Sequence, residues 1–397
     1  MLNSLSFKKC VQVQRHNRMV FPQFSIIVPV YNADHFLCPL MKQLQEQTIQ
    51  NFEVIFVNDC SPDNSAEILT LLSKEDERVR IFHHERNRCQ GAARNTGLDN
   101  ARGEFILYID ADDSIPNHYI ESLKKGIEKY DADIAICNSI WVYPDHEECH
   151  NMFIDNPSIP EMVMSGEEAL QRYFNVFQDD IRIPVEPWGR IIRRSLIENY
   201  HLRNPDTLFE DIVMSFSELL FSQKVMLLNE YLYYYNRKNN AAATVDRKKQ
   251  YISDFPYVFE GIKIVLMNHG LDEQYKKWLT RFYFRYLAGV YGFFAKGGYF
   301  PDEMHQAIIH YRTLLQNPHI DGSEEFISLQ LIGFKIEMER NNLPEIFNVF
   351  IEVHPEIQSL VRKNYRFFLI YYVYLFKRYG SLKKVCIIIQ KYLGSNK

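Results

Sequence analysis

Candidate ligand-binding residues, most of them polar, follow three of the strand-like runs in this sequence, at the point where each run ends. They are Pro29, Tyr31 and Asn32 after the first run, Asp59 after the second, and Asp110, Asp112 and Asp113 after the fourth. In an open parallel sheet, ligands bind outside the carboxyl ends of the strands. If the runs form such a sheet, these side chains converge on one edge and define a candidate ligand site.

Two of these carboxylates, Asp110 and Asp112, are spaced so that both could hold a divalent cation. Carboxylate oxygens suit Mg²⁺ or Mn²⁺, which could then bridge to the phosphate oxygens of a nucleotide. Residues 29–34, the first turn, contain no glycine, and the chain has neither GxGxxG nor a P-loop, so phosphate turns of those kinds are excluded. The competing interpretation is that a residue of 112–114 caps a helix that opens at Pro116.

Alternating strand and helix patterns must position these side chains. Apolar runs predict five strands in the first part of the chain, and helical spacing or helix-start signals predict helices between them. The predicted strands are Phe24–Val28, Phe52–Val57, Val79–Phe82, Glu104–Ile109 and Ile134–Cys137, and the predicted helices are 34–47, 66–74, 92–101 and 116–130. Single helices between strands are typical of βαβ units, so we expect an α/β fold with a mostly parallel sheet flanked by helices.

The chain becomes less regular after this part. Residues 139–210 are mixed, and they are followed by a helical run, 212–223, and two strand-like runs, 225–228 and 231–235. From about residue 250 the pattern is almost wholly helical and rich in aromatic residues. The predicted parts are a lead-in over 1–23, a domain over 24–246 whose halves are 24–125 and 126–246, and a mainly helical C-terminal domain over 247–397.

Composition narrows the class of protein. The 397 residues are 46% hydrophobic and 24% charged, which excludes a mainly disordered chain. The net charge of −5 is unevenly spread, because residues 362–397 carry nine Lys and Arg and no Asp or Glu, and the remainder is acidic. An acidic body argues against a nucleic-acid partner. The basic, aromatic tail fits either an anionic membrane surface or a core helix with solvated ends.

Cysteine use and hydropathy bear on the compartment. The seven cysteines are scattered without a CxxC spacing, which favours a reducing cytosol over a disulfide framework or a zinc cluster. The first 23 residues have no apolar run long enough for a signal peptide. The longest apolar stretch, Phe367–Phe376, has ten residues, whereas a spanning helix needs about 20. We therefore expect a cytoplasmic protein.

Several motifs occur together in a characteristic order. They are Ser25–Asn32 (SIIVPVYN), Val57–Asp59 (VND), Gly91–Gly97 (GAARNTG), Gly103–Ile106 (GEFI) and Tyr108–Asp113 (YIDADD), with looser blocks at Pro187–Arg190, Phe209–Asp211 and Tyr233–Arg237. Through these motifs the chain resembles the family 2 glycosyltransferases of the GT-A fold, a large bacterial group that builds surface polysaccharides. The resemblance covers residues 24 to about 240 and leaves the rest of the chain unexplained.

The resemblance implies that the first half of the domain binds a UDP-sugar. The implied nucleotide-binding residues are Pro29, Tyr31, Asn32, Asp59, Arg94, Asp110 and Asp112, of which the last two also bind the metal. Asp59 would accept a hydrogen bond from the uracil N3–H, a donor that cytosine lacks. Simpler roles stay open, since Pro29 could serve the turn and core, Asp59 could cap a helix near Pro62, and Arg94 could form a surface salt bridge.

The second half is implied to hold the acceptor and the catalytic base. An inverting transferase needs one base to take the proton of the acceptor hydroxyl, and the resemblance implies Asp211 for this role. Glu210 could equally be the base or support it, and Asp211 could instead cap a helix that starts at Ile212. The other implied contacts are those of Trp188 and Asp113 with the donor or acceptor sugar, and of Arg190 and Arg237 with the diphosphate. Trp188 could equally be a core residue.

One departure from the family lies in the loop after the second strand. The family often has Asp-Asp-Gly-Ser where this chain has Asn58, Asp59, Cys60 and Ser61. A cysteine can replace the small residue, but the turn is expected to differ.

The sequence therefore predicts a metal-dependent, inverting glycosyltransferase that moves a hexosyl or N-acetylhexosaminyl group. Its acceptor would belong to a bacterial surface glycan (lipopolysaccharide, capsule or lipid-linked oligosaccharide), reached from the inner face of the plasma membrane. Two alternatives remain, a sugar nucleotidyltransferase and a nucleotide-sugar or glycan-binding module without catalysis. The glycine-free first loop counts against the former, and the acidic residues at 110, 112 and 211 count against the latter.

Overall fold

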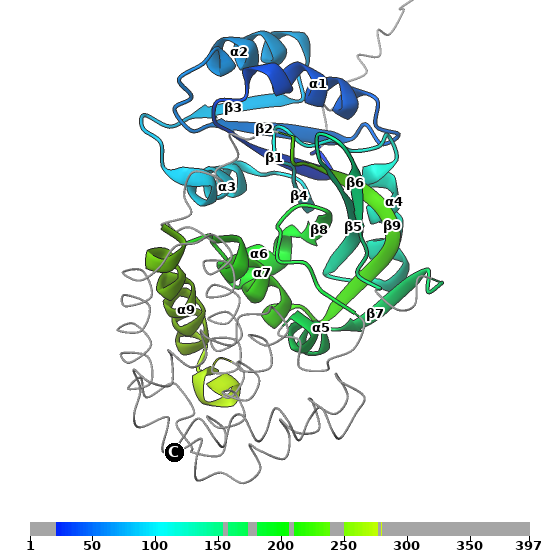
Figure 1. Ribbon diagram of the computed structural model, residues 1–397, viewed down its shortest axis with the longest axis vertical. Helices are drawn as coiled ribbons and strands as arrows, with labels where there is room; N and C mark the ends of the chain where they lie inside the picture. The colour runs from blue at the N-terminus through cyan, green and yellow to red at the C-terminus, as the bar shows by residue number, and fades with distance from the viewer. Residues whose placement is uncertain are drawn as a thin grey trace, which may run out of the picture.

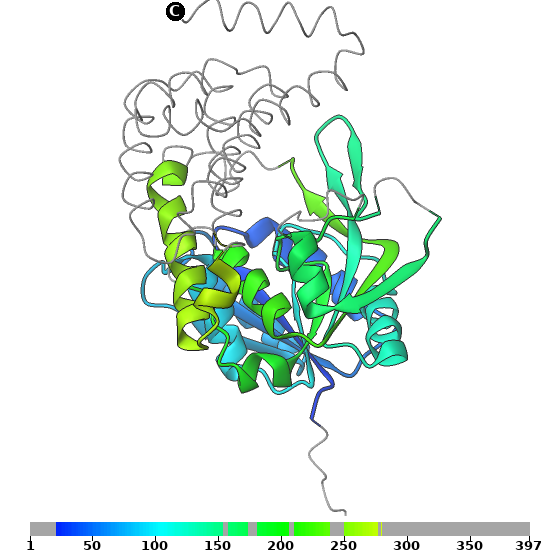
Figure 2. The same ribbon diagram turned by 90° about the horizontal axis from the view of Figure 1, so that it is seen from below.

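The computed structural model describes residues 21–153, 158–173, 181–205, 210–238, 250–276 and 279. In this part of the chain a single sheet of nine strands has helices on both faces (Figures 1 and 2). The strands are β1 (Phe24–Val30), β2 (Phe52–Asn58), β3 (Val79–His83), β4 (Phe105–Tyr108), β5 (Ile134–Val142), β6 (Glu147–His150), β7 (Glu161–Ser165), β8 (Arg190–Arg193) and β9 (Lys224–Asn236). Their order in the sheet is β3-β2-β1-β4-β8-β5-β9-β7, with β6 paired to β5.

The helices between the first five strands confirm the βαβ prediction. The helices are α1 (Asp34–Gln45), α2 (Ser65–Glu75), α3 (Cys89–Asn100), α4 (Tyr119–Tyr130), α5 (Gly166–Tyr173), α6 (Arg194–Asn199), α7 (Glu210–Phe221) and α9 (Gln250–Asn268). Two starts differ from the prediction, because α3 begins before residue 92 and α4 begins after residue 116. The later start of α4 leaves the turn after β4 outside the helix.

Pro29 lies inside β1 and does not end it. The strand continues past Pro29, which stands opposite Val57 of β2. On the other side, the pairing of β1 with β4 ends where Ile27 faces Tyr108. Proline has no N–H to donate, so its position beyond this last pair costs the sheet no hydrogen bond. The predicted end of the first strand is therefore too early.

The sheet is parallel at one end and mixed at the other. Strands β1 to β4 pair in parallel, and β5 pairs in parallel with β9. Between these two groups lies β8, antiparallel to both β4 and β5, and β7 lies antiparallel on β9. The sequence did not predict β6, β7 or β8, because they are short and lie in the irregular part of the chain. The two strand-like runs after α7 are one strand, β9, with a register shift opposite Asn138.

Two large hydrophobic clusters cover the two faces of the described sheet, and a small third one joins β2 to α3. Adjacent residues of β1 point to opposite faces, so Ile27 joins one cluster while Ile26 and Val28 join the other. Helices α1, α2 and α4 pack on the second face, and α3, α5, α6, α7 and α9 pack on the first. The packing of α9 on α7 ties the start of the predicted C-terminal domain to the sheet domain.

Part of the predicted organisation lies outside the described residues. This holds for residues 1–20, for the domain boundary near 246 and for most of 247–397, including the basic tail 362–397. The domain limits therefore stay predictions. Among the described residues, no helix is both long and apolar enough to span a bilayer.

Candidate active site

The loop after β1 opens the candidate site at the carboxyl edge of the sheet. Tyr31 is 53% exposed, and the neighbouring Asn32 has a φ of 52°. Asparagine is one of the few residues with a side chain that adopt this conformation readily. The Asn32 N–H donates to Ser61 Oγ at 3.2 Å, which links the loops after β1 and β2. Pro29 is buried in the sheet, so Tyr31 and Asn32 are the exposed members of this predicted group.

Asp59 directly follows β2, and its side chain is almost completely buried, with 4% exposed. Its Oδ1 accepts a hydrogen bond from Arg88 N at 2.8 Å and lies 2.6 Å from Nδ1 of His84. The helix-cap interpretation of Asp59 is wrong, because α2 begins at Ser65, whose N–H donates to Asp63. The carboxylate of Asp59 is therefore buried in this loop without serving as a helix cap.

Asp110 and Asp112 lie in the turn after β4. Asp110 Oδ1 accepts hydrogen bonds from Gln90 Nε2 at 2.8 Å and from Arg94 Nη2 at 3.1 Å. The Asp112 carbonyl accepts one from Asn236 Nδ2 at 3.0 Å, which joins this turn to the end of β9. The two predicted metal ligands are thus fixed by contacts with two other parts of the domain.

Asp113 has a structural place next to this pair. Its Oδ2 accepts a hydrogen bond from the Tyr233 hydroxyl at 2.6 Å, and its Oδ1 accepts one from Asn236 N at 2.8 Å. Burial, together with the charges of Asp110 and Asp112, raises the pKa of Asp113 well above its ordinary value. Because both oxygens are bonded to β9, the structure places Asp113 in the scaffold and not at a sugar. The helix-cap interpretation of this turn also fails, since α4 begins beyond it.

Arg94 connects the donor motif to the candidate catalytic helix. Its side chain is 2% exposed, and Nη1 donates to Glu210 Oε1 at 2.8 Å while Nη2 bonds Asp110. It is therefore no surface salt bridge, which corrects the simpler interpretation. Gly91, one turn earlier on α3, makes room for this contact, because a Cβ there would lie 2.8 Å from Glu210 Cγ.

Asp211 lies beside Glu210 in the first turn of α7. Its Oδ1 accepts a hydrogen bond from Ile212 N at 2.9 Å. Burial is the main cause that raises the pKa of Asp211 to about 7, and the charge of Glu210 adds to it, while Arg94 opposes the shift. A carboxyl with this pKa can exchange a proton near neutral pH, which suits a general base.

Trp188 and Arg190 lie inside the domain, away from the exposed edge. Trp188 is 6% exposed, and its ring stacks on that of Tyr233 with centroids 4.4 Å apart. The structure supports the core interpretation of Trp188 over a sugar platform. Arg190 is fully buried, and its Nη1 lies 3.0 Å from Glu218 Oε2. The structure therefore places Arg190 in the scaffold and not at the diphosphate.

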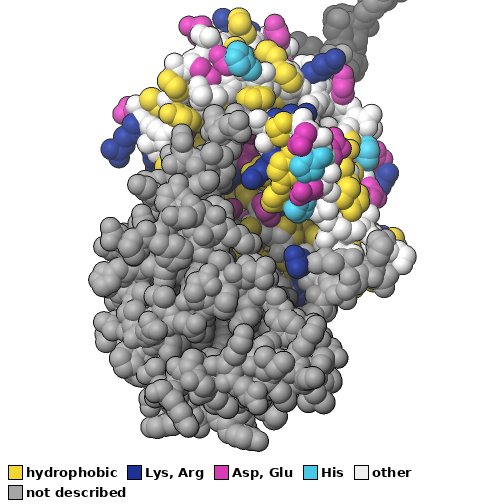
Figure 3. Space-filling model, in the orientation of Figure 1, with side chains coloured by type: hydrophobic (Ala, Val, Ile, Leu, Met, Phe, Trp, Pro, Cys, Tyr) yellow, Lys and Arg dark blue, Asp and Glu magenta, His cyan; other side chains and the backbone are white. Residues whose placement is uncertain are grey.

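Arg237 lies just past the end of β9, among aromatic side chains. Its guanidinium carbon is 5.3 Å from the ring centroid of Trp141, 5.6 Å from that of Tyr235 and 5.9 Å from that of Tyr143. Histidine and acidic side chains gather over the hairpin of β5 and β6 (Figure 3). Arg237 follows Asn236, which is bonded to the turn after β4, so it remains close to the candidate site.

Sequence reasoning missed several residues of this site. His84, Gln90, Tyr233 and the backbone N–H of Asn236 all bond the predicted carboxylates. His84 could have been found, because it follows the third strand just as Asp59 follows the second. The contacts from β9 could not, because the pairing partner of that strand was unknown.

The oxygens at residues 110 and 112 fit a divalent cation in donor type. Among the described residues, no three His, Cys, Asp or Glu side chains gather in a group able to hold a metal ion. A cation at Asp110 and Asp112 would therefore take its remaining ligands from phosphate oxygens and water, as is common for Mg²⁺.

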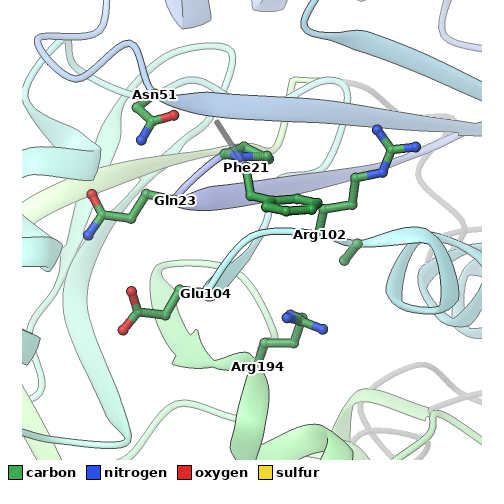
Figure 4. Close-up of a pocket in the computed structure, with 8 residues that line it drawn as sticks. Phe21, Gln23, Asn51, Arg102, Glu104 and Arg194 are labelled. Carbon is green, nitrogen blue, oxygen red and sulfur yellow. The ribbon is translucent and has the colours of Figure 1, made fainter. Parts of the chain in front are cut away.

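A separate cavity of about 730 Å³ lies at the opposite edge of the sheet (Figure 4). It is lined by Phe21, Pro22, Gln23, Asn51, Ala101, Arg102, Glu104 and Arg194. Most of these residues precede β1, β2 or β4, so they lie at the amino ends of the strands. The predicted site residues lie at the carboxyl ends, and the cavity is not part of that site.

Comparison with known proteins bears on this geometry. Residues 25–200 match the family described as glycosyl transferase family 2. Glycosyltransferase GlyG of Streptococcus pneumoniae is 27% identical over 235 residues, which are 59% of this chain and 77% of that protein. Glycosyltransferase GlyA of the same species is 32% identical over 234 residues, which are 58% of this chain but only 33% of that protein.

A solved structure gives the same picture of the fold. Staphylococcus aureus TarS 1–349 in complex with UDP-GlcNAc superposes with a TM-score of 0.64 over 84% of this chain and 92% of that one, at 20% identity. The fold is thus that of the GT-A glycosyltransferases. Residues 25–200 thus resemble glycosyl transferase family 2, and the chain is similar to proteins named as glycosyltransferases.

Proposed function

We propose that this chain transfers a sugar from a UDP-α-sugar to an acceptor hydroxyl with inversion at the anomeric carbon. The observation that carries the proposal is the bridge from Arg94 to Asp110 of the donor motif and to Glu210 beside the candidate base. It supports one site in which donor binding and proton removal lie side by side. The TarS complex with UDP-GlcNAc supports UDP as the carrier on this fold.

Asp211 takes the proton of the acceptor hydroxyl as its oxygen attacks the anomeric carbon. Glu210 is less suited, because its carboxylate is held in place by the hydrogen bond from Arg94. The negative charge of Glu210 in turn helps raise the pKa of Asp211 to about 7. General-base catalysis contributes typically 10²- to 10⁴-fold, and one such group is enough for inversion.

The donor lies over the ends of β1, β2 and β4. Tyr31 offers an exposed ring for the base, Asn32 lines the same slot, and Asp59 accepts the uracil N3–H. Asp112 and Asp110 would hold a Mn²⁺ or Mg²⁺ ion, which would supply positive charge to stabilise the leaving diphosphate. Arg237 is the remaining candidate for a contact with the diphosphate.

The acceptor is proposed to be a hydroxyl of a bacterial surface glycan. Relatives named as glycosyltransferases in Streptococcus pneumoniae, and the putative glycosyltransferase EpsH of Bacillus subtilis at 29% identity, support the bacterial context. We place the protein in the cytoplasm, with the basic residues 362–397 binding the anionic inner face of the membrane. Vesicle binding by the full chain and by a chain ending at Val361 tests this placement, and equal binding would contradict it.

Release of UDP tests the reaction. The full chain is incubated with single UDP-sugars and Mn²⁺, with and without glycan acceptors, and UDP is measured. We expect one UDP-sugar to be consumed in a metal-dependent way, and Asp112→Ala to abolish both this turnover and metal-dependent UDP binding. Pyrophosphate release from UTP and a sugar phosphate would point to a nucleotidyltransferase instead. UDP-sugar binding without turnover on any acceptor would point to a binding module.

A further inference from the structure

His84 and Asp59 occupy matching positions on neighbouring strands. The parallel register of β2 and β3 pairs Asn58 with His83, the last residue of each strand. The backbone N–H of His84 then donates to Asn58 O at 2.9 Å, which extends the ladder by one step. The side chains that follow each strand are therefore held next to each other by the sheet itself.

The ring of His84 is fixed at both of its nitrogens. Nδ1 lies 2.6 Å from Asp59 Oδ1, and Nε2 lies 2.8 Å from Thr96 Oγ1 on α3. A carboxylate oxygen can only accept, so Nδ1 carries the proton of the first hydrogen bond. The side chain of His84 is 6% exposed. The histidine thus ties the loop after β2 to the helix that carries Arg94.

These contacts use only one oxygen of Asp59. Oδ1 takes both the His84 ring and the Arg88 N–H. Within the described part of the chain, no hydrogen bond to Oδ2 is found, and this atom is not among the fully enclosed unpaired ones. A buried carboxylate with one satisfied oxygen and one accessible oxygen presents a single, oriented acceptor to a ligand.

The loop beside Asp59 needs such support. Cys60 has a φ of 59°, in the left-handed region that favours glycine. A residue with a side chain stays in this region only where its surroundings hold it there. Here the Ser61 N–H donates to Asn58 Oδ1 at 3.1 Å, and His84 and Arg88 hold Asp59.

We propose that His84 is a positioning residue for uracil selection. It bonds Oδ1 of Asp59 and so directs Oδ2 at the N3–H of the bound base. This inference rests on the proposed function, in which Asp59 reads the uracil. The selectivity for UDP over CDP then depends on the hydrogen-bonded chain Asp59–His84–Thr96, called the relay below, and not on Asp59 alone.

Binding of UDP and CDP by the full chain tests the relay, because cytosine lacks the N3–H donor. Calorimetric titrations with each nucleotide in the presence of Mg²⁺ give both affinities for the wild type, His84→Ala, His84→Asn and Asp59→Asn. His83→Asn is the matched control, since His83 is adjacent but bonds Asn58 and not Asp59. Thermal unfolding of each variant shows whether it is folded.

We expect His84→Ala to weaken UDP binding about tenfold, the loss of roughly one hydrogen bond, while CDP binding stays unchanged. His84→Asn, whose amide can still donate to Asp59, should retain most of the selectivity for UDP over CDP. The control His83→Asn should retain all of this selectivity. Adding His84→Ala to Asp59→Asn should cause little further loss, because both changes remove the same contact.

Two results would overturn the relay. One is a His84→Ala protein with the wild-type ratio of UDP to CDP affinity, and the other is an equal loss for both nucleotides, which marks a purely structural role. If His84→Ala does not fold, the ratio measured for His84→Asn decides, since full loss of selectivity there contradicts the proposal. A wild type that binds UDP and CDP equally would instead refute the role of Asp59 in the proposed function, and this relay with it.

Discussion

Two arginines of this domain are equally hidden from solvent but lie in opposite surroundings. Arg94 is 2% exposed and Arg190 is 0% exposed. The partners of Arg94, Asp110 and Glu210, keep 18% and 10% of their side-chain surface exposed, whereas the partner of Arg190, Glu218, keeps none. One ion pair faces a ligand edge, and the other is closed inside the core.

The contrast shows that a buried arginine does not by itself mark a site. Burying a charge is costly unless it is paired, so both guanidiniums need their carboxylates. Around Arg94 the carboxylates are shared with the ligand edge, and Asp211 has a raised pKa beside them. The partner of Arg190, Glu218, has no exposed surface and so cannot also contact a ligand. The exposure of the partner thus separates the candidate active site from the scaffold.

The largest expected effect is on catalysis at the partly exposed cluster of Arg94, Asp110, Glu210 and Asp211, called the open cluster below. Asp211→Asn should lower kcat about 10²- to 10⁴-fold, because an amide cannot take the proton of the acceptor hydroxyl. UDP affinity should stay within about threefold of the wild type, since the donor contacts lie elsewhere. The check is UDP release together with calorimetric UDP binding. Full activity in this variant would contradict the assignment of the base.

Changes to the fully buried pair of Arg190 and Glu218 should lower the free energy of unfolding but leave catalysis nearly unchanged. Arg190→Met leaves Glu218 buried without its partner, a change that costs about 3–5 kcal/mol in comparable cases. We expect urea unfolding to show this loss, while kcat/KM of the remaining folded enzyme stays within about threefold. Arg94→Met should instead reduce kcat/KM by about a hundredfold or more. Equal catalytic losses in both variants would remove the distinction between the two pairs.

The pH dependence of kcat/KM should report on Asp211, which lies beside the ion pairs of Arg94. Asp211 acts as a base only when it is deprotonated, so kcat/KM should rise about tenfold per pH unit up to about pH 7 and then level off. Because the pKa is raised on folding from 3.8, the native state binds this proton more tightly than the unfolded chain. The associated stability is present at low pH and is lost as the pH rises to about 7. A profile with no break near pH 7 would contradict the assignment.

The smallest effect is expected from crowding the open cluster by one methyl group. In Gly91→Ala the new Cβ would lie 2.8 Å from Glu210 Cγ and 3.1 Å from the Pro205 carbonyl oxygen, so Glu210 must shift. We expect kcat to fall about tenfold, the scale of a small misplacement near the reacting groups. Gly126→Ala is the matched control, because its Cβ meets the flexible Met226 Sδ at 2.9 Å. An unchanged kcat in Gly91→Ala would show that Glu210 need not be held in place.

The sequence predicted those features of the site that depend on local pattern, namely the residues that follow each strand. The strand-end rule led to Asp59 and to Asp110, and both do lie at the carboxyl edge of one sheet. It could not show that Arg94 contacts Glu210, 116 residues away, because such a contact depends on how the second half folds back.

The errors of the prediction have the same origin. Trp188, Asp113 and Arg190 were placed at ligands by their motifs, but packing against β9 or α7 uses their side chains inside the domain. The antiparallel β8 was missed because a strand of four residues, with arginine at each end, has no clear periodicity. Motif position and residue type were informative, whereas burial was not foreseeable from either.

The place of β8 has a consequence for how the chain is made. β8 fills the gap between β4 and β5, yet it is synthesised about 50 residues after β5 ends. At the usual 5–20 residues per second, two bare strand edges wait about 3–10 s for their shared neighbour. Unpaired edges attract other strands, so the nascent domain is open to wrong pairing during this interval. A chaperone that shields those edges should therefore raise the yield of folded protein, and slower synthesis through residues 143–189 should lower it.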